Sequence, residues 1–533
     1  MQGSGTTTSV WMSASPGPTQ TGPMPAGNAD LAAEKPDVIV VGAGIAGVTT
    51  AYLLQRSGKR VLLLDDGQPG DGETGRTTAH LSNAIDDRYT EMIRLHSESG
   101  ARMAADSHSA AIDTIERIAR EEGIDCDFAR LDGYLMLAPG QSPSTNDKTI
   151  DKELDAARRA GLEDVERMDH PPIHHPGPCL RFPRQGRFHA LKYLAGLTRA
   201  FLARGGRLAT RAHVSAVGQE GERAHVHVGH VHVGHAHVSP GHTTIEADAV
   251  VVATNSPISD RFAIHTKQAA YRTYAIAARV PKGAVPDGLY WDTLDSYHYV
   301  RLQPEGNHDL LIVGGEDHKT GEARDMDSRW AALEAWTREH FPEAGAVEYR
   351  WSGQVMEPFD GLAFIGRDPA YGGRIFVATG DSGMGMTHGT IAGMVLCELI
   401  HGSGSPWAAL YDPGRKMTNK LGTYLRENID VGRQYLDYVR RSEVESEQAI
   451  APGEGAVLKS GGKPIAVYRD DAGTLHRRSA VCPHLKCVVH WNPGEKTWDC
   501  PCHGSRFAVD GAVLNGPATQ PLAEVEDSAS RTG

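Results

Sequence analysis

The sequence predicts an α/β nucleotide-binding domain that is interleaved with an antiparallel-sheet domain and followed by a small all-β domain. Three observations support this fold class. A glycine-rich turn joins a strand to a helix near residue 42, segments of alternating hydrophobicity fill the middle of the chain, and short strands with many turns surround four cysteines after residue 449. At 533 residues the chain has room for roughly three to four domains, each with its own core.

Hydrophobic periodicity places the elements in an order that alternates between the two sheets. Strands are predicted at 38–41, 61–64, 207–210, 249–255, 271–280, 297–302, 310–313 and 374–378. Helices are predicted within 45–58, 89–123, 191–203, 330–340 and 390–400, with a charged helical connector over 418–447.

The composition excludes several classes of protein. With 54 basic and 67 acidic residues the formal net charge is −13, which argues against a nucleic-acid partner or an anionic membrane surface. Residues 1–35 are rich in Gly, Thr, Ser, Pro and Ala, with no basic residue before Lys35, and predict a disordered leader rather than a secretory signal. We therefore expect a cytoplasmic protein without a membrane partner.

The first glycine-rich turn predicts a dinucleotide site. Gly42 allows the tight turn, Gly44 allows backbone amides to approach a pyrophosphate, and Gly47 allows close packing of the helix. Asp65 ends the next strand, where a carboxylate accepts hydrogen bonds from ribose hydroxyls.

Three further segments resemble one flavoprotein superfamily. They are the loop 75–78 (Gly-Arg-Thr-Thr), the strand 248–254, and the late glycine cluster 380–387. Together they resemble the D-amino-acid-oxidase-like superfamily, which includes sarcosine and glycine oxidases, over roughly residues 36–402. The resemblance implies FAD rather than NAD as the cofactor.

The resemblance also implies which residues contact the flavin. In that superfamily the late glycine cluster opens a helix whose N-terminus faces the flavin O2 edge, where negative charge develops on reduction. The residues carried over are Arg76, Thr77, Val214, Gly380, Asp381, Gly383, Met384, Gly385, Met386 and Thr387. His80 is a candidate for covalent attachment, but its sequence context departs from that of the histidyl-linked members, so non-covalent FAD is favoured.

The spacing Cys482-x-His484, fifteen intervening residues, Cys500-x-x-His503 is the most specific motif in the chain. Two thiolates on one iron and two imidazoles on the other make a Rieske [2Fe-2S] centre. A zinc ion held by the same four residues is the alternative. The surrounding sequence resembles the cytochrome-bc-type Rieske pattern, which implies a disulfide between Cys487 and Cys502.

Departures from that Rieske pattern predict a low reduction potential. Ser505 matches the serine that hydrogen-bonds a cluster sulfur, and residues 515–518 resemble the loop that covers the cluster. Phe507 occupies the place of a tyrosine that donates to a ligand thiolate in high-potential members, and Lys486 replaces a glycine. Fewer hydrogen bonds to sulfur stabilise the reduced cluster less, so we expect a potential below the respiratory type.

The resemblances refine the predicted fold class to an α/β Rossmann-type FAD-binding domain interleaved with an antiparallel-sheet substrate domain, plus a C-terminal all-β Rieske domain. The predicted boundaries are 36–89, 180–265 and 355–402 for the FAD domain, 90–179 and 266–354 for the substrate domain, 403–448 for the connector, and 449–533 for the Rieske domain.

The combination of the two centres predicts an FAD-dependent oxidoreductase. The architecture resembles a bacterial family in which an amine-oxidase-like flavin module is fused to a Rieske domain. We expect oxidation of a C–N bond of an amine or amino acid by hydride transfer to flavin, with electrons relayed through the cluster to an external acceptor. The candidate residues for holding the substrate share one face of a strand and are Tyr297, Tyr299 and Arg301. Arg301 would bind a carboxylate of the substrate. No lysine occurs in 310–313, where sarcosine-oxidase relatives place an oxygen-activating one.

Two other functions stay open at the level of sequence. One is a flavin/Rieske monooxygenase or reductase component, although Asp169, His174 and His175 miss the spacing of the mononuclear iron site that a Rieske oxygenase needs. The other is an electron carrier or redox sensor without catalysis. The His-Val repeat at 225–239 is interpreted as a solvated hairpin, with metal binding as the alternative.

Overall fold

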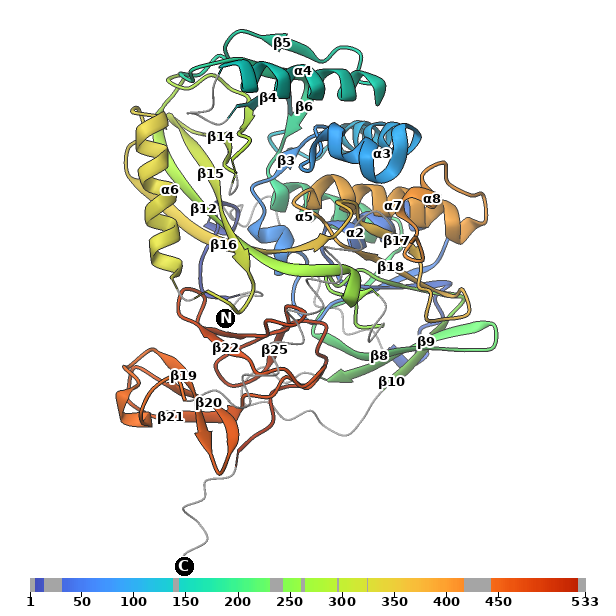
Figure 1. Cartoon of the computed structure of the whole chain (residues 1–533). Helices are drawn as coiled ribbons and strands as arrows, with labels where there is room; N and C mark the ends of the chain where they lie inside the picture. The colour runs from blue at the N-terminus through green and yellow to red at the C-terminus, as the bar shows by residue number, and fades with distance from the viewer. Residues whose placement is uncertain are drawn as a thin grey trace, which may run out of the picture.

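The computed structural model describes residues 5–13, 31–137, 143–230, 243–259, 264–294, 297–323, 325–416 and 442–525. In Figure 1 the C-terminal domain, coloured orange to red, lies beneath a larger body that contains both predicted sheets. Within the described residues, no helix is long and apolar enough to cross a membrane.

The first sheet is mostly parallel, as the predicted Rossmann-type α/β domain requires. Its six strands follow the order β17-β18-β11-β1-β2-β7, and all neighbours pair in parallel except β17. The strands are β1 (Val38–Val41), β2 (Val61–Leu64), β7 (Arg207–Ala209), β11 (Ala249–Val252), β17 (Phe364–Arg367) and β18 (Ile375–Thr379). Every residue of β1, β2 and β11 is buried, as expected of short apolar strands that are covered on both faces.

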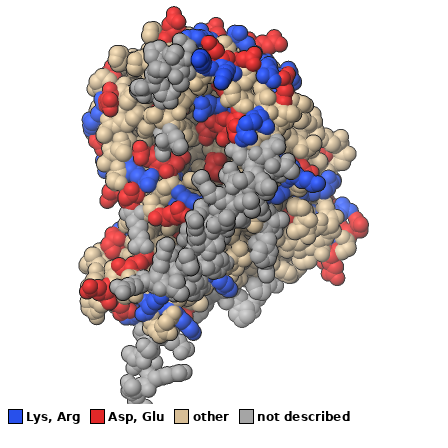
Figure 2. Space-filling view, viewed as in Figure 1, with Lys and Arg blue, Asp and Glu red and all other residues tan. Residues whose placement is uncertain are grey.

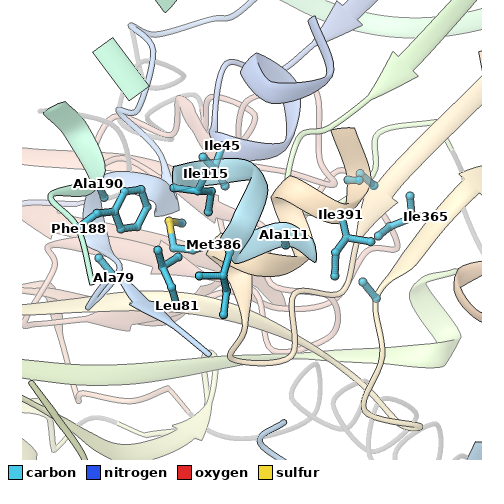
Figure 3. Packing of buried hydrophobic residues seen from close by; sticks show 14 of the residues in the cluster. Ile45, Ala79, Leu81, Ala111, Ile115, Phe188, Ala190, Ile365, Met386 and Ile391 are labelled. Atoms are coloured by element: carbon cyan, nitrogen blue, oxygen red, sulfur yellow. The ribbon is translucent and has the colours of Figure 1, made fainter. Parts of the chain in front are cut away.

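Helices cover one face of this sheet and a small antiparallel sheet covers the other. The helices are α2 (Ile45–Arg56), α3 (Arg88–Glu121), α5 (Ala190–Ala203) and α7 (Gly385–His401), and Figure 3 shows the apolar side chains packed among them. A Cβ on Gly393 would lie 2.6 Å from Thr49 Cγ2, so this glycine lets α7 approach α2 closely. The opposite layer consists of β8 (Ala212–Glu220), β9 (Arg223–His230) and β10 (Thr243–Ala247).

Part of the His-Val repeat lies on β9. Val226 and Val228 face the core, whereas His225 and His227 are partly exposed on the other face. This alternation agrees with the interpretation as a hairpin, and residues 231–239 lie outside the described residues.

The second sheet is antiparallel over most of its width and has nine strands in the described part of the chain, in the order β16-β12-β15-β14-β13-β4-β6-β3 with β5 beside β6. The strands are β3 (His80–Leu81), β4 (Ala129–Met136), β5 (Glu166–Met168), β6 (Cys179–Arg187), β12 (Gln268–Pro281), β13 (Leu289–Trp291), β14 (Tyr299–Glu305), β15 (His308–Lys319) and β16 (Val347–Pro358). Helix α6 (Met326–His340) packs on β12 and β15, and α4 (Pro143–Arg159) lies near β5 and β6 (Figure 1).

Two stretches that the sequence analysis placed in the FAD domain need correction. Within the predicted segments 36–89 and 180–265, β3 and β6 pair with each other, and β6 also pairs with β4, so both belong to the antiparallel sheet. Residues 179–187 contain Pro183 and three arginines at positions 181, 184 and 187, unlike the uniformly apolar buried strands of the first sheet.

The C-terminal domain is all-β, as predicted. One sheet contains β19 (Gly455–Ser460), β20 (Lys463–Arg469) and β21 (Leu475–Ser479). The other contains β22 (His490–Asn492), β23 (Thr497–Asp499), β24 (Arg506–Phe507) and β25 (Val513–Asn515). Of the predicted connector, α8 (Ala408–Tyr411) and the short helix η6 (Glu447–Ala449) are described, and residues 417–441 lie outside the described residues.

The prediction of a disordered leader is wrong for residues 5–13. This segment contains the one-turn helix α1 (Val10–Ser13) and is packed into the body of the protein. Trp11 is 1% exposed, its ring lies 4.9 Å from that of His189, and its Nε1 donates to Thr77 O at 2.5 Å. The average composition of the first 35 residues concealed the short apolar run Val10-Trp11-Met12, which supplies the buried surface that orders this segment.

Candidate functional site

A cavity of about 1010 Å³ lies between the two sheets of the body and extends to the C-terminal domain. It begins at the glycine-rich turn after β1, passes the start of α7, and reaches Tyr297 and Tyr299 at one side. Residues Val513, Leu514, Asn515, Gly516, Ala518 and Thr519 of the C-terminal domain also line it. Its volume is at the upper end of the range for ligand sites in proteins.

The glycine-rich turn has the geometry that a dinucleotide requires. A Cβ on Gly42 would lie 2.3 Å from Ala253 O, and one on Gly47 would lie 1.8 Å from Gly42 O, so neither position tolerates a side chain. Gly44 is the N-cap of α2 and, with Gly42, lines the cavity, whereas Gly47 lies behind the turn. The helix N-terminus thus faces a space where a pyrophosphate fits.

Asp65 lies where its predicted role requires. Its two carboxylate oxygens accept hydrogen bonds from the backbone amides of Ala43 at 2.5 Å and Gly67 at 2.7 Å. Burial and the neighbouring Asp66 raise the pKa of Asp65 to about 7. Each oxygen retains a lone pair that can accept from a ribose hydroxyl.

The late glycine cluster reaches the same cavity. Of the predicted flavin contacts, Thr77, Val214, Gly380, Asp381, Gly383, Met384, Gly385 and Met386 line it. Thr387 does not line it, and its hydroxyl donates to Met384 O at 3.0 Å inside the first turn of α7. Met386 contributes its side chain to the apolar core (Figure 3). The arrangement fits a flavin ring against the N-terminal end of α7.

His80 and Arg76 line the cavity but are bonded to the protein. His80 Nε2 donates to Val300 O at 3.3 Å and its Nδ1 pairs with the Thr78 hydroxyl at 3.1 Å. The guanidinium of Arg76 binds Glu495 Oε1 at 3.1 Å and Ser352 O at 3.0 Å. Arg76 therefore connects the flavin loop to the C-terminal domain.

The two candidate tyrosines lie together at the cavity wall. The Tyr297 hydroxyl donates to Asp86 Oδ2 at 2.9 Å, the Tyr299 hydroxyl lies 2.6 Å from Thr273 Oγ1, and the two rings are 5.4 Å apart. Asp86 and Thr273 were not predicted, because they come from a loop and a strand far from residue 297 in the sequence. The signal that the sequence offered was the pair Asp86-Asp87 between the flavin loop and the first long helix.

The prediction that Arg301 binds a substrate carboxylate is wrong in this structure. Arg301 is fully buried, and its Nη1 donates to Ala79 O at 2.8 Å and Phe188 O at 3.1 Å. Its Nη2 donates to Gln303 Oε1 at 2.5 Å. Arg301 therefore braces two distant backbone segments and the Gln303 side chain, a role that strand periodicity cannot distinguish from facing the cavity.

The four predicted cluster ligands lie at one end of the C-terminal domain. Cys482 and Cys500 are 1% and 2% exposed, and hydrogen bonds from Cys500 and Ser505 lower the pKa of Cys482 against the effect of burial. The rings of His484 and His503 are 5.2 Å apart. The two thiols thus face each other beside a pair of imidazoles, the donor set that a [2Fe-2S] cluster needs.

The implied disulfide is present, because Cys487 and Cys502 are bonded to each other. It joins the two ligand loops. Lys486 has a φ of 63°, which explains why the pattern usually has glycine at this position.

Asp169 and His174 are exposed whereas His175 is buried against Leu137 O, so these three do not face one another.

The predicted low potential can be tested at Phe507, which is fully buried in β24. Phe507→Tyr should raise the one-electron reduction potential by roughly 40–60 mV, since one added hydrogen bond stabilises the reduced cluster by about 1–1.5 kcal/mol. A redox titration followed by EPR measures the shift. A wild-type potential in the respiratory range, or no shift in the variant, would contradict the prediction.

The ligand histidines face the body of the same chain. His265, in the short helix η3 (His265–Lys267), is 2% exposed, and its ring lies 5.2 Å from that of His484 and 5.6 Å from that of His503. Gln354 Nε2 donates to Gly504 O at 3.0 Å, and Asn515 Nδ2 donates to Glu73 Oε1 at 3.2 Å. The end of the C-terminal domain that holds the predicted cluster ligands is thus docked on the body that contains the two large sheets.

A buried charge network fixes this contact. Glu495 Oε1 lies 3.1 Å from Arg76 Nη1 and 3.4 Å from Arg272 Nη2, and all three side chains are at most 1% exposed. Ser352 Oγ donates to the same oxygen at 2.5 Å, and Thr7 from the N-terminal segment donates to it at 2.6 Å. Burial alone would raise the pKa of Glu495, but Arg76 and Arg272 outweigh it and lower the pKa.

Comparison with known proteins gives two family matches along the chain. A model of the FAD-dependent oxidoreductase family matches residues 37–399, and one of the Rieske [2Fe-2S] domain matches residues 441–526. The putative Rieske 2Fe-2S iron-sulfur protein YhfW of Bacillus subtilis is 31% identical over 496 residues, which are 92% of this chain and 93% of that protein.

Two solved structures share the fold of the body. Glycine oxidase from Geobacillus kaustophilus has a TM-score of 0.57 at 17% identity, covering 72% of this chain and 99% of its own. L-proline dehydrogenase from P. horikoshii has a TM-score of 0.56 at 17% identity, covering 71% of this chain and 97% of its own.

Proposed function

The chain belongs to the FAD-dependent oxidoreductase family and carries a C-terminal Rieske [2Fe-2S] domain, and on that premise we propose that it oxidises a C–N bond of an amine or amino acid and passes the electrons through the cluster to an external acceptor. Its cofactors are FAD and a [2Fe-2S] cluster. The cluster would be held by Cys482, His484, Cys500 and His503.

One observation carries the proposal of an electron relay. The imidazole pair of the Rieske domain contacts His265 of the flavin-binding body, and residues 513–519 of the same domain line the cavity beside the glycine clusters. Both cofactor sites therefore lie in one continuous packed unit. Tethering two redox sites in this way replaces a bimolecular encounter with an intramolecular step.

The chain's own side chains supply binding and orientation. Hydride acceptance and one-electron release are the chemistry that flavin supplies when bound. Tyr297 and Tyr299 would position the substrate, with their hydroxyls fixed by Asp86 and Thr273. The Rieske loop at 513–519 closes one side of the cavity and limits the access of water. The proposal does not include Arg301, whose guanidinium is used inside the fold.

Anaerobic mixing of the holoenzyme with a panel of secondary amines and amino acids tests this function. We expect at least one compound to bleach the flavin absorbance and to produce the EPR signal of a reduced Rieske cluster. If reduced nicotinamide alone bleaches the flavin, the protein is a reductase component. If no compound in the panel and no nicotinamide bleaches it, the protein is a carrier or sensor.

The contact of His265 with the ligand histidines gives a further prediction. His265→Ala removes the ring through which the flavin-binding body contacts His484 and His503, so the docked geometry should loosen and reduction of the cluster should slow by about tenfold or more. Flavin bleaching by substrate should keep its wild-type rate. Stopped-flow absorbance and freeze-quench EPR separate the two steps, and unchanged cluster reduction would show that His265 does not set the docked geometry.

A further inference from the structure

The charges that line the cavity narrow the substrate class. Resting on the proposed function, we propose that the site selects a cationic amine that lacks a carboxylate, and that Asp317 and Asp86 hold its positive charge. The proposal concerns the part of the cavity beside Tyr297 and Tyr299.

Acidic side chains from separate elements converge on this part of the cavity. Asp86 precedes α3, Asp317 lies on β15, and Glu357 lies on β16, and each lines the cavity. Figure 2 shows Asp and Glu atoms above the middle of one face, with Lys and Arg atoms beside them. Three elements far apart in sequence thus bring negative charge to one enclosed space.

Asp317 has an unsatisfied carboxylate oxygen. Its Oδ1 is buried and has no hydrogen-bond partner among the described residues, while the Thr273 hydroxyl bonds to the carboxylate. Burial raises the pKa of Asp317 to about 6, and burial together with Asp87 raises that of Asp86 to about 7. Carboxylates that line an enclosed cavity in this way are stabilised by a cation that pairs with them.

The positive charges of the lining do not offer a carboxylate receptor. Among the described residues that line the cavity the arginines are Arg76 and Arg88, and no lysine lines it. Arg76 is held by Glu495, and Arg88 follows Asp86 and Asp87 directly in the chain. Carboxylates therefore outnumber guanidinium groups in the lining, and a substrate carboxylate would meet net negative charge.

A series of three compounds of equal chain length tests the selectivity. We measure binding to the oxidised holoenzyme at pH 8 by calorimetry for 1,4-diaminobutane, 4-aminobutanoate and butanedioate, whose net charges fall from positive through zero to negative. We expect the diamine to bind at least about 100-fold more tightly than 4-aminobutanoate, because the carboxylate of 4-aminobutanoate is repelled by the carboxylates of the cavity. Butanedioate, with two carboxylates, should bind most weakly. Equal or reversed affinities, or no binding of the diamine, would overturn the proposal.

Two variants with the same change in charge locate the effect. Asp317→Asn should weaken diamine binding by about tenfold or more, the usual value of a charged hydrogen bond, and should reduce the preference over 4-aminobutanoate. Asp164→Asn, on an exposed turn, should change neither affinity. Flavin absorbance confirms that both variants are folded and loaded. If Asp317→Asn keeps the wild-type affinities, Asp317 does not bind the cationic group.

The same compounds separate this inference from the proposed function. Tight binding of the diamine without flavin bleaching by any amine would contradict the function and leave the cation selectivity intact. Bleaching by amino acids in preference to amines without a carboxylate would support the function and overturn the inference.

Discussion

Replacing Cys482 with serine should abolish the EPR signal of the cluster and reduce turnover with a one-electron acceptor by at least about 100-fold. Substitutions of residues that merely support metal ligands already lower activity by up to about this factor. The thiol of Cys482 lies buried against that of Cys500, and a hydroxyl does not replace a thiolate on iron. Flavin content and anaerobic bleaching by substrate should stay at wild-type levels, because the flavin turns lie in the other domain.

Cys397→Ser is the matched control for this loss. Cys397 is a half-buried thiol on α7 that packs against the body, away from the four predicted ligands. It should keep both the EPR signal and turnover. If Cys482→Ser loses the signal yet still turns over at the wild-type rate with the acceptor, electrons leave the flavin directly and the relay is wrong.

The second large effect is expected at Glu495. Glu495→Gln leaves Arg76 and Arg272 buried without their counter-charge, and removing one partner of such a group costs about 3–5 kcal/mol. Because Glu495 belongs to the Rieske domain and both arginines to the flavin-binding body, the loss should weaken the contact between them. Calorimetric unfolding should show a lower transition temperature, and the exposed substitution Glu163→Gln should leave it unchanged.

The same residue sets a dependence on pH. The pKa of Glu495 is lower in the folded protein than in the unfolded chain, so its stabilisation is present above the ordinary glutamate range and disappears as the pH falls through the folded value. Wild-type stability should therefore drop toward that of Glu495→Gln in acid, and the two should differ most at neutral pH. A constant difference across the whole pH range would contradict the assigned role.

The sequence was sufficient where a short pattern carries its own geometry. Gly42 and Gly47 predict the turn, because backbone atoms occupy the space that a Cβ atom at either position would need. The predicted cluster site depends only on the spacing of its four ligands and needs no knowledge of the fold; they are Cys482, His484, Cys500 and His503. The disulfide between Cys487 and Cys502 followed from the resemblance of the surrounding sequence and is present.

The sequence was insufficient where side chains from distant elements meet. Strand periodicity placed Arg301 beside Tyr299 but could not show that carbonyl oxygens of residues 79 and 188 surround it. The contact of His265 with the ligand histidines, like the network around Glu495, depends on how two domains dock. Average composition concealed the burial of Trp11.

The central claim is that electrons pass between flavin and cluster within one chain. Its most direct test is freeze-quench EPR after anaerobic mixing with a bleaching substrate, at protein concentrations that differ by about tenfold. The docked arrangement predicts that the signal of the reduced cluster follows flavin bleaching with a first-order rate that is independent of protein concentration. Bleaching without an EPR signal, or a rate of cluster reduction that rises in proportion to protein concentration, would contradict the account.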